Sequence, residues 1–233
     1  MRVAFLGSGQ FAVPILEGVS KSRHEVVLVV CPLDRPAGRG LKLKPCPVAE
    51  FAQGAGLKLH KTGDVNSPAS IEAICEAKPE VILVADFGQI LGPEALSIPP
   101  RGALNVHPSL LPKFRGPAPI PRAILAGERE TGVTVILMSE EVDAGEIILQ
   151  ERVAIEDEDD NITLREKLSV LGAKLAVEAL DLIEEGRAQR TPQDPSKASH
   201  APWVRKEEAW LNWSEPATSI WRKVRAFAGW PVA

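Results

Sequence analysis

Short apolar runs alternate with helical patterns through residues 2–138, and few folds accommodate such an alternation. The expected strands are residues 2–6, 25–30, 57–60, 81–85, 103–107 and 133–138. The expected helices include residues 48–55, residues 71–77, and a first helix with Phe11, Ile15, Leu16 and Val19 on its apolar face. Strands that are separated by helices pair in parallel. The pattern therefore predicts an α/β fold, with a twisted, mostly parallel sheet and helices on both faces.

The composition favours a folded cytoplasmic protein. Hydrophobic residues make up 45% of the 233 residues and charged residues 25%, which allows a sizeable core and excludes a disordered chain. The longest apolar run, residues 26–31, is far shorter than the roughly 20 residues of a membrane-spanning helix, and the first residues do not read as a secretory signal. Cys31, Cys46 and Cys75 have neither disulfide nor metal spacing. A net charge of −4 excludes binding of nucleic acid through overall charge.

The C-terminal third changes character. Leucine and alanine recur at helical spacing through residues 162–185, and Asp159 or Asp160 is placed to cap that helix. Residues 187–199 are polar and contain two prolines, which is typical of a linker. All five tryptophans then lie between Trp203 and Trp230. We expect a second structural unit there, which either docks on the first domain or begins something larger.

A basic loop follows the second expected strand. Arg35, Arg39, Lys42 and Lys44 lie within residues 34–45, with no acidic residue between Asp34 and Glu50. Cations spaced along a glycine-containing loop can follow phosphate groups. On composition alone, the same charges could simply keep a surface loop solvated. The loop is nevertheless the best local site for a polyanion in this acidic chain.

The most informative stretch joins an amide and an imidazole at one strand end. Asn105 and His107 are two residues apart on an expected strand, so their side chains point to the same side, and Pro108 ends the strand. Ligands bind at the carboxyl ends of the strands in open parallel sheets. Both groups can stabilise an oxyanion, which suits acyl transfer. The alternative is a hydrogen-bonded histidine at a strand end beside an asparagine that serves a turn.

Asp143 is the candidate carboxylate partner, because it follows the expected strand 133–138 and precedes Gly145 in a turn. An aspartate that only shapes that turn is the alternative. No serine or cysteine has a nucleophile signature and no residue cluster has metal spacing, so we expect neither covalent nor metal chemistry. The turn Gly7-Ser8-Gly9 has the form of a dinucleotide fingerprint but lacks its third glycine, which favours a plain strand-to-helix turn.

These motifs resemble those of the formyltransferases that use 10-formyltetrahydrofolate. The match lies in residues 105–116 (NVHPSLLPKFRG) and in Asp143-Ala144-Gly145. The loop DRPAGRGLKLKP, with ETGVTVILM, KEEAWLNW and RAFAGWP, is similar to the methionyl-tRNA formyltransferases in particular. The resemblance covers residues 1–233. Phe87, Ala144 and Pro117 depart from the usual residues of the family, and together they could reshape the pocket.

The resemblance implies a Rossmann-like catalytic domain over residues 1–186, a linker over 187–204, and in 205–233 the first strand and helix of a truncated C-terminal β-barrel domain. It implies Asn105, His107 and Asp143 as the catalytic residues. It also implies that the folate donor contacts Phe87, Gly88, Gln89, Ile90, Leu91, Ser109, Leu110, Leu111, Pro112 and Val142.

The implied acceptor is methionine on initiator tRNA, and the basic residues Arg35, Arg39, Lys42 and Lys44 would contact the acceptor arm. We further expect a cytoplasmic monomer that needs no metal. Two alternatives remain at this point. A sister enzyme could formylate a small amine, either an amino sugar nucleotide or a purine precursor, or the chain could be a non-catalytic folate- or tRNA-binding remnant.

Overall fold

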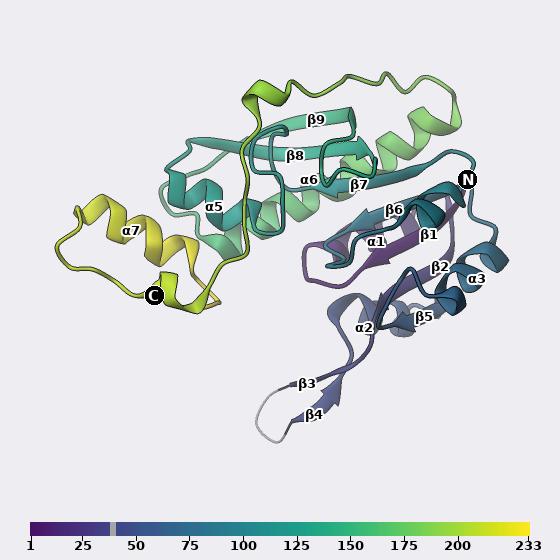
Figure 1. Ribbon diagram of the computed structural model, residues 1–233, viewed down its shortest axis with the longest axis horizontal. Helices are drawn as coiled ribbons and strands as arrows, with labels where there is room; N and C mark the ends of the chain where they lie inside the picture. Colours follow the sequence, from purple (N-terminus) through teal and green to yellow (C-terminus); the bar gives the residue numbers. More distant parts are fainter. Residues whose placement is uncertain (38–40) are drawn as a thin grey trace.

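The computed structural model describes residues 1–37 and 41–233, and it is built around a seven-stranded sheet in the order β5-β2-β1-β6-β7-β8-β9 (Figure 1). The strands are β1 (Arg2–Gly7), β2 (Glu25–Pro32), β5 (Leu59–Thr62), β6 (Val81–Ala85), β7 (Ala103–His107), β8 (Glu130–Leu137) and β9 (Glu146–Ala154). The first five pair in parallel, whereas β8 and β9 are antiparallel additions. The prediction of a mostly parallel sheet is confirmed.

Helices cover both faces of the sheet. They are α1 (Ala12–Ser20), α2 (Pro47–Gly54), α3 (Pro68–Ala77), α4 (Pro93–Ser97), α5 (Pro119–Ala126), α6 (Asn161–Glu184) and α7 (Ala217–Ala226). Alternate residues of β1 enter two separate cores: Val3 and Phe5 pack with α1 and α6, whereas Ala4 and Leu6 pack with α3 and α4. This period of two is what a strand buried on both faces requires.

Proline begins four of these helices. Pro47, Pro68, Pro93 and Pro119 each lie in the first turn, where a missing N–H costs nothing and the fixed φ suits the helix. The proline-rich stretch between β6 and α5 therefore sets helix starts as well as loop shape. The loops that follow β6 and β7 therefore end at α4 and α5, whose first turns contain Pro93 and Pro119.

The basic segment is a hairpin rather than the expected open loop. Strands β3 (Arg35–Ala37) and β4 (Lys42–Lys44) pair antiparallel and project from the body of the molecule (Figure 1). Both faces of an isolated two-stranded ribbon are exposed to solvent. Neither face needs apolar residues, which explains why no alternating apolar pattern predicted these strands. Arg39 lies outside the described residues.

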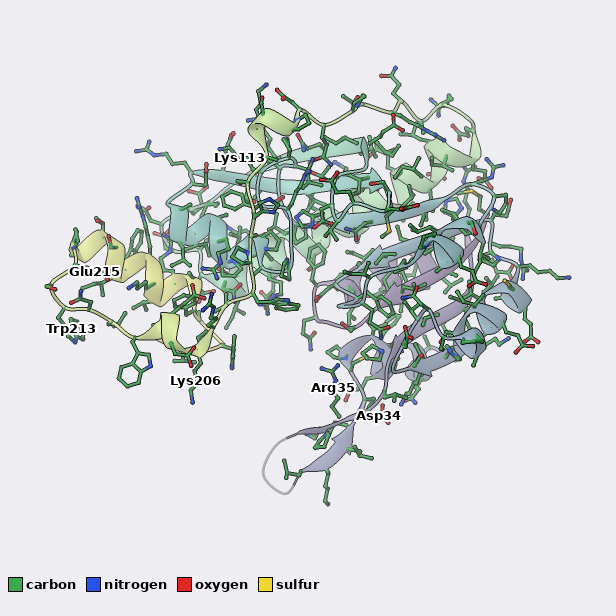
Figure 2. The ribbon with its side chains drawn as sticks, in the orientation of Figure 1. Asp34, Arg35, Lys113, Lys206, Trp213 and Glu215 are labelled. Atoms are coloured by element: carbon green, nitrogen blue, oxygen red, sulfur yellow. The ribbon has the colours of Figure 1, made fainter. Side chains whose placement is uncertain are left out.

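The C-terminal segment packs on the rest of the molecule through α7. Ala226 and Phe227 are buried in the core that α1 and α6 share, and α7 contacts α5. The expected strand is not found in residues 205–233, which contain only the short 3₁₀ turn η2 (Lys206–Ala209) and α7. The tryptophans are largely exposed, and Figure 2 shows Trp213 at the outer edge of this segment. No helix in the described ranges is long and apolar enough to cross a bilayer.

Candidate active site

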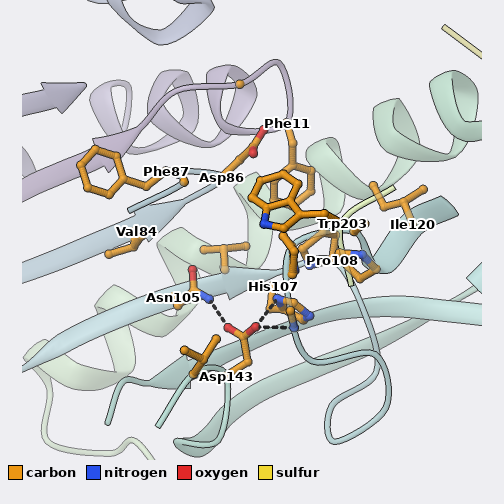
Figure 3. Close-up of a pocket in the computed structure, with 18 of the residues that line it drawn as sticks. Phe11, Val84, Asp86, Phe87, Asn105, His107, Pro108, Ile120, Asp143 and Trp203 are labelled. Carbon is orange, nitrogen blue, oxygen red and sulfur yellow. Dashed lines mark hydrogen bonds and ion pairs between the residues drawn. The ribbon is translucent and has the colours of Figure 1, made fainter. Parts of the chain in front are cut away.

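Strand β7 presents an amide and an imidazole to one large cavity. Asn105 and His107 both line it, which confirms that their side chains share a face of the strand (Figure 3). His107 is buried, with 4% of its surface exposed. Asn105 is paired in register with Val84 of β6, so both groups lie at the carboxyl end of the parallel part of the sheet.

Asp143 reaches these two groups from the turn between β8 and β9. Its Oδ1 accepts a hydrogen bond from Asn105 Nδ2 at 3.1 Å, and its Oδ2 lies 3.6 Å from His107 Nδ1 (Figure 3). Gly145 allows the turn to close, because a Cβ at that position would lie 1.8 Å from the carbonyl oxygen of Leu137. The structure therefore brings the three predicted catalytic side chains together.

The segment after β7 holds two of these side chains through its backbone. The Phe114 carbonyl lies 2.9 Å from His107 Nε2, and the Gly116 N–H donates to Asp143 Oδ2 at 2.8 Å. Because a carbonyl can only accept, the proton of a neutral His107 is on Nε2. The other ring nitrogen, Nδ1, then faces Asp143 and the cavity.

A glutamine from the expected linker braces the Asp143 turn. Gln193 Nε2 donates to the carbonyl oxygens of Asp143 and Gly145, both at 2.8 Å. Its Oε1 accepts from the buried guanidinium of Arg115 at 2.9 Å, and Arg115 also pairs with Glu141. The segment 187–204 is thus bonded to the site along part of its length. Sequence reasoning missed Gln193, because nothing in a polar, proline-containing stretch reveals its spatial partner.

The cavity has a volume of about 1210 Å³, above the roughly 300–1,000 Å³ of a typical single-ligand pocket. Of the residues expected to contact the donor, the cavity is lined by Phe87, Gly88, Gln89, Ile90, Leu91 and Val142. Residues that were not named individually as binding residues also line it, among them Phe11, Asp86 and Trp203 (Figure 3). Arg165 lines it as well. The space is sufficient for parts of two substrates at once.

Four residues expected to contact the donor do not line this cavity: Ser109, Leu110, Leu111 and Pro112. Ser109 is fully buried and its hydroxyl donates to the Lys113 carbonyl at 2.7 Å. The Leu111 N–H donates to Thr134 Oγ1 at 3.2 Å. Ser109 and Leu111 therefore have structural partners near the loop that carries Phe114 and Gly116, and the contact of residues 109–112 with the donor stays a prediction.

The basic hairpin lies apart from the cavity lining. Arg35, Lys42 and Lys44 are exposed on β3 and β4, and Figure 2 shows Arg35 where the hairpin joins the body. Beside it, Asp34 pairs with Lys61 at 2.6 Å. The cations therefore form a surface feature separate from the catalytic side chains.

The Gly7-Ser8-Gly9 turn uses its donors internally. The backbone N–H groups of Ser8 and Gly9 donate to the Asp86 carbonyl at 3.0 and 3.3 Å. A dinucleotide-binding turn instead directs such N–H groups at a phosphate. This geometry agrees with the plain strand-to-helix turn that the sequence favoured.

Outside the cavity, His24, Asp181 and Glu184 bring possible ligand atoms within 4.8 Å of one another, a cluster that sequence spacing could not show. Two cations already occupy it. The Met1 ammonium lies 2.9 Å from Glu184, and Arg23 pairs with Asp181 at 2.6 Å. Burial lowers the pKa of His24, with a further lowering from the Met1 ammonium. These cations favour a salt-bridge network over a metal centre.

Comparison with known proteins agrees with the site. The formyl transferase profile matches residues 1–180, and the formyl transferase C-terminal domain profile matches residues 204–233. A methionyl-tRNA formyltransferase from Moorella thermoacetica is 43% identical over 233 residues, which cover 100% of this chain and 75% of that protein. One from Thermus thermophilus is 45% identical over 231 residues, covering 99% of this chain and 74% of that protein.

A solved structure shares the architecture. Glycinamide ribonucleotide transformylase 1 from Symbiobacterium toebii aligns with a TM-score of 0.67 and 26% identity, covering 83% of this chain and 94% of that protein. Three findings indicate the same family: the profile matches, the relatives that align over the whole chain, and the shared architecture. The chain belongs to the formyl transferase family, and within it to the methionyl-tRNA formyltransferases.

Proposed function

We propose that this chain transfers the formyl group of 10-formyltetrahydrofolate to the α-amine of methionine on initiator tRNA. The observation that carries the proposal is the contact of Asn105, Asp143 and His107 at the wall of one cavity. The identity of 43–45% to methionyl-tRNA formyltransferases over essentially the whole chain supports this acceptor. We further propose that the chain works as a cytoplasmic monomer.

The amide of Asn105 has two N–H donors, and Asp143 uses one of them. The second can donate to the oxygen of the formyl group as the amine attacks its carbon and negative charge develops there. Asp143 thereby fixes the direction in which the catalytic N–H points. Because this N–H is already aligned, the site can stabilise the oxyanion without rearranging during the reaction.

His107 acts through Nδ1, because Nε2 is bonded to the Phe114 carbonyl. In the protonated ring, Nδ1 is a second donor for the oxyanion, and the Asp143 carboxylate beside it balances the charge. In the neutral ring, Nδ1 accepts a proton from the attacking amine, either directly or through a water. The Gly116 N–H keeps Asp143 in place during both events. The tetrahedral intermediate then collapses: the bond between the formyl carbon and the folate nitrogen that carried it breaks, this nitrogen receives the proton that His107 took from the amine, and tetrahydrofolate leaves.

We assign Phe87–Leu91 and Val142 to donor binding, and the basic hairpin to the tRNA acceptor arm. The exposed cations Arg35, Lys42 and Lys44 can follow phosphates without entering the cavity. Arg39, which lies outside the described residues, was assigned to the same surface from sequence. For the domains, we propose a catalytic domain over 1–186, a connecting segment over 187–204 and a tRNA-binding unit that includes 205–233.

Single-turnover transfer tests the proposal. The chain is mixed with labelled 10-formyltetrahydrofolate and charged initiator tRNA, and formyl-methionine is quantified after hydrolysis of the ester. We expect rapid labelling of methionyl-tRNA and none of uncharged tRNA.

The competing function is formylation of a small amine, as the name of the Symbiobacterium toebii relative implies for that protein. Glycinamide ribonucleotide and an amino sugar nucleotide are offered in competition with methionyl-tRNA. Preferential labelling of either one would overturn the proposed acceptor. Folate binding without transfer to any acceptor would instead favour a non-catalytic remnant.

A further inference from the structure

Asp86 places a carboxylate on the wall of the cavity across from Asp143 (Figure 3). It directly follows β6 and has a left-handed backbone conformation, with φ of +47°. The Ser8 hydroxyl and the N–H groups of Ser8 and Gly9 all bond to its carbonyl oxygen, which fixes the backbone. A Cβ at residue 9 would lie 1.8 Å from Asp86 Oδ2, so the glycine makes room for this carboxylate.

The carboxylate has no partner that explains its position. Among the described residues it accepts no hydrogen bond, and the only charge that acts on it is that of Arg165. Burial among the surrounding protein atoms raises the pKa of Asp86, and Arg165 lowers it by less. The side chain is nevertheless open to the cavity. The exposed carboxylate meets solvent in the free protein. A ligand that fills the cavity would remove that water, so a bound cation or donor group is the partner that would offset the loss.

The position in the fold is one that binds ligands. From β1 the chain moves outward in one direction through β2 and β5, and from β6 in the other through β7, so β1 and β6 flank the switch point of the sheet. Asp86 lies at the carboxyl end of β6, beside the turn after β1. It is two residues past Val84, just as His107 is two residues past Asn105, the pairing partner of Val84. Asp86 and the side chains of Asn105 and His107 therefore line the same cavity at the ends of neighbouring strands.

The charge of Asp86 indicates which substrate it binds. An α-amine has a pKa of about 8 in peptides and is less basic in an ester, so part of the acceptor amine is an ammonium ion at neutral pH. This ammonium must give up one proton to water or to a carboxylate before its nitrogen can attack. The folate donor carries carboxylates of its own, and its expected contacts lie at Phe87–Leu91 and Val142. Asp86 instead lies against Gly9, on the side of the cavity that Phe11 and Trp203 line (Figure 3). We propose that Asp86 binds the α-ammonium group of the aminoacyl acceptor and thereby selects an unmodified amine; this inference rests on the proposed function.

Binding measurements test Asp86 apart from catalysis. The probes are 3′-deoxy-3′-(methionylamino)adenosine, which carries the ammonium, its N-acetyl derivative, which does not, and tetrahydrofolate. Calorimetric titration compares wild type with Asp86→Asn and Asp86→Ser. Glu94→Gln is the matched control, because it removes an exposed carboxylate from α4, outside the cavity.

We expect both Asp86 variants to bind the cationic probe about 10- to 100-fold more weakly, as loss of a hydrogen bond to a charged group predicts. Binding of the N-acetyl probe and of tetrahydrofolate should not change, and the latter also shows that the variants are folded. Equal loss for both adenosine probes would overturn the proposal and point to a ribose contact. Loss of tetrahydrofolate binding would place Asp86 in the donor site, and unchanged binding of all probes would remove it from recognition.

Failure of the proposed function gives a different result. If wild type formylates methionyl-tRNA while the Asp86 variants bind the cationic probe normally, only the assignment of Asp86 fails. If wild type neither transfers formyl to methionyl-tRNA nor distinguishes the two adenosine probes, the proposed acceptor fails as well.

Discussion

At the residue scale, the carboxylate of Asp143 makes several of the contacts that shape the site. Asp143 accepts from Asn105 and Gly116 and faces His107, so one carboxylate orients both groups that we propose to be catalytic. The left-handed backbone of Asp143, with φ of +52°, is stabilised by those contacts and by the close approach that Gly145 permits. Changing any one of these residues therefore disturbs more than its own contact.

Replacement of Asn105 by Ala should slow formyl transfer by a factor of about 100 to 1,000, as expected for loss of one oxyanion donor. Because the donor acts in the transition state, kcat and kcat/KM should fall together. Steady-state assays over a range of methionyl-tRNA concentrations measure both. Asn212→Ala, which removes an exposed amide from the C-terminal segment, is the control. Near-normal turnover in Asn105→Ala would exclude its amide from the mechanism.

The pH dependence of acceptor binding should identify Asp86. Its ionised form binds the ammonium, so affinity for the cationic adenosine probe should fall as the pH drops through the raised pKa of Asp86. That loss should occur at a higher pH than for an ordinary aspartate. The other charged or titratable groups lining the cavity are His107, Glu140, Glu141, Asp143 and Arg165. Titration calorimetry of Asp86→Asn should show no such loss of affinity. If the loss persists in this variant, another titratable group of the cavity causes it.

At the element scale, α6 shows how local sequence sets a boundary. The sequence offered Asp159 and Asp160 as caps, and the structure uses Asp160, whose Oδ1 accepts from the N–H groups of Ile162 and Thr163 at 2.8 and 2.9 Å. Asp159 instead pairs with Lys167 at 2.7 Å. Burial opposes ionisation of Asp159, but the bonds from Lys167 and from the Glu156 N–H outweigh it and lower its pKa.

Asp160→Ala should lower the free energy of unfolding by about 1 kcal/mol, because two N–H groups at the start of α6 lose their acceptor. Chemical denaturation measures the change. Glu158→Ala, an exposed acid just before the helix, is the matched control and should have little effect. If both variants unfold at the same denaturant concentration, the cap does not contribute measurably to stability.

The basic hairpin is an element whose role is electrostatic. Replacing Lys42 and Lys44 together by Ala should weaken tRNA binding and lower the slope of log K against log salt by about 2, one for each lost phosphate contact. Filter binding over a salt series measures this slope. The control replaces Lys21 and Lys58, exposed lysines outside the hairpin. Unchanged tRNA affinity at every salt concentration would separate the hairpin from tRNA binding.

At the scale of the whole molecule, distant segments complete the site. Gln193 follows Asp143 by 50 residues in the chain and bonds to its carbonyl, while Arg115 holds the other end of the glutamine amide. Asp143, Arg115 and Gln193 come from three separate loops, so the tertiary fold fixes the position of the catalytic carboxylate.

Gln193→Ala should lower kcat by about 30-fold, because two hydrogen bonds to the Asp143 turn are lost and each is worth about 1 kcal/mol. Affinity for the donor and the acceptor should change less, since the glutamine touches neither in the proposed arrangement. Gln189→Ala, an exposed glutamine of the same segment, is the control. A loss of affinity with unchanged kcat would show that the segment serves binding instead.

The sequence alone determined the features that depend on local chemistry. Periodic apolar residues placed the central strands within a few residues of their observed ends, and two-residue spacing put Asn105 and His107 on one face. The motif around residues 105–116 predicted the family. These features are readable because strand alternation and helix caps depend on residues close together in the chain.

Only the tertiary structure decided the rest. It showed that Ser109 bonds to Lys113 and Leu111 to Thr134, that the basic segment is a hairpin, and that residues 205–233 contain no strand. It also brought Asp86 and Gln193 to the cavity wall and the Asp143 turn. Asp86 precedes Phe87, which the sequence placed in the donor pocket, but its contact with Gly9 could not be read from neighbouring residues, nor could the partners of Gln193. Both are set by how the sheet and its loops pack. Position in space, unlike periodicity, is a property of the whole fold.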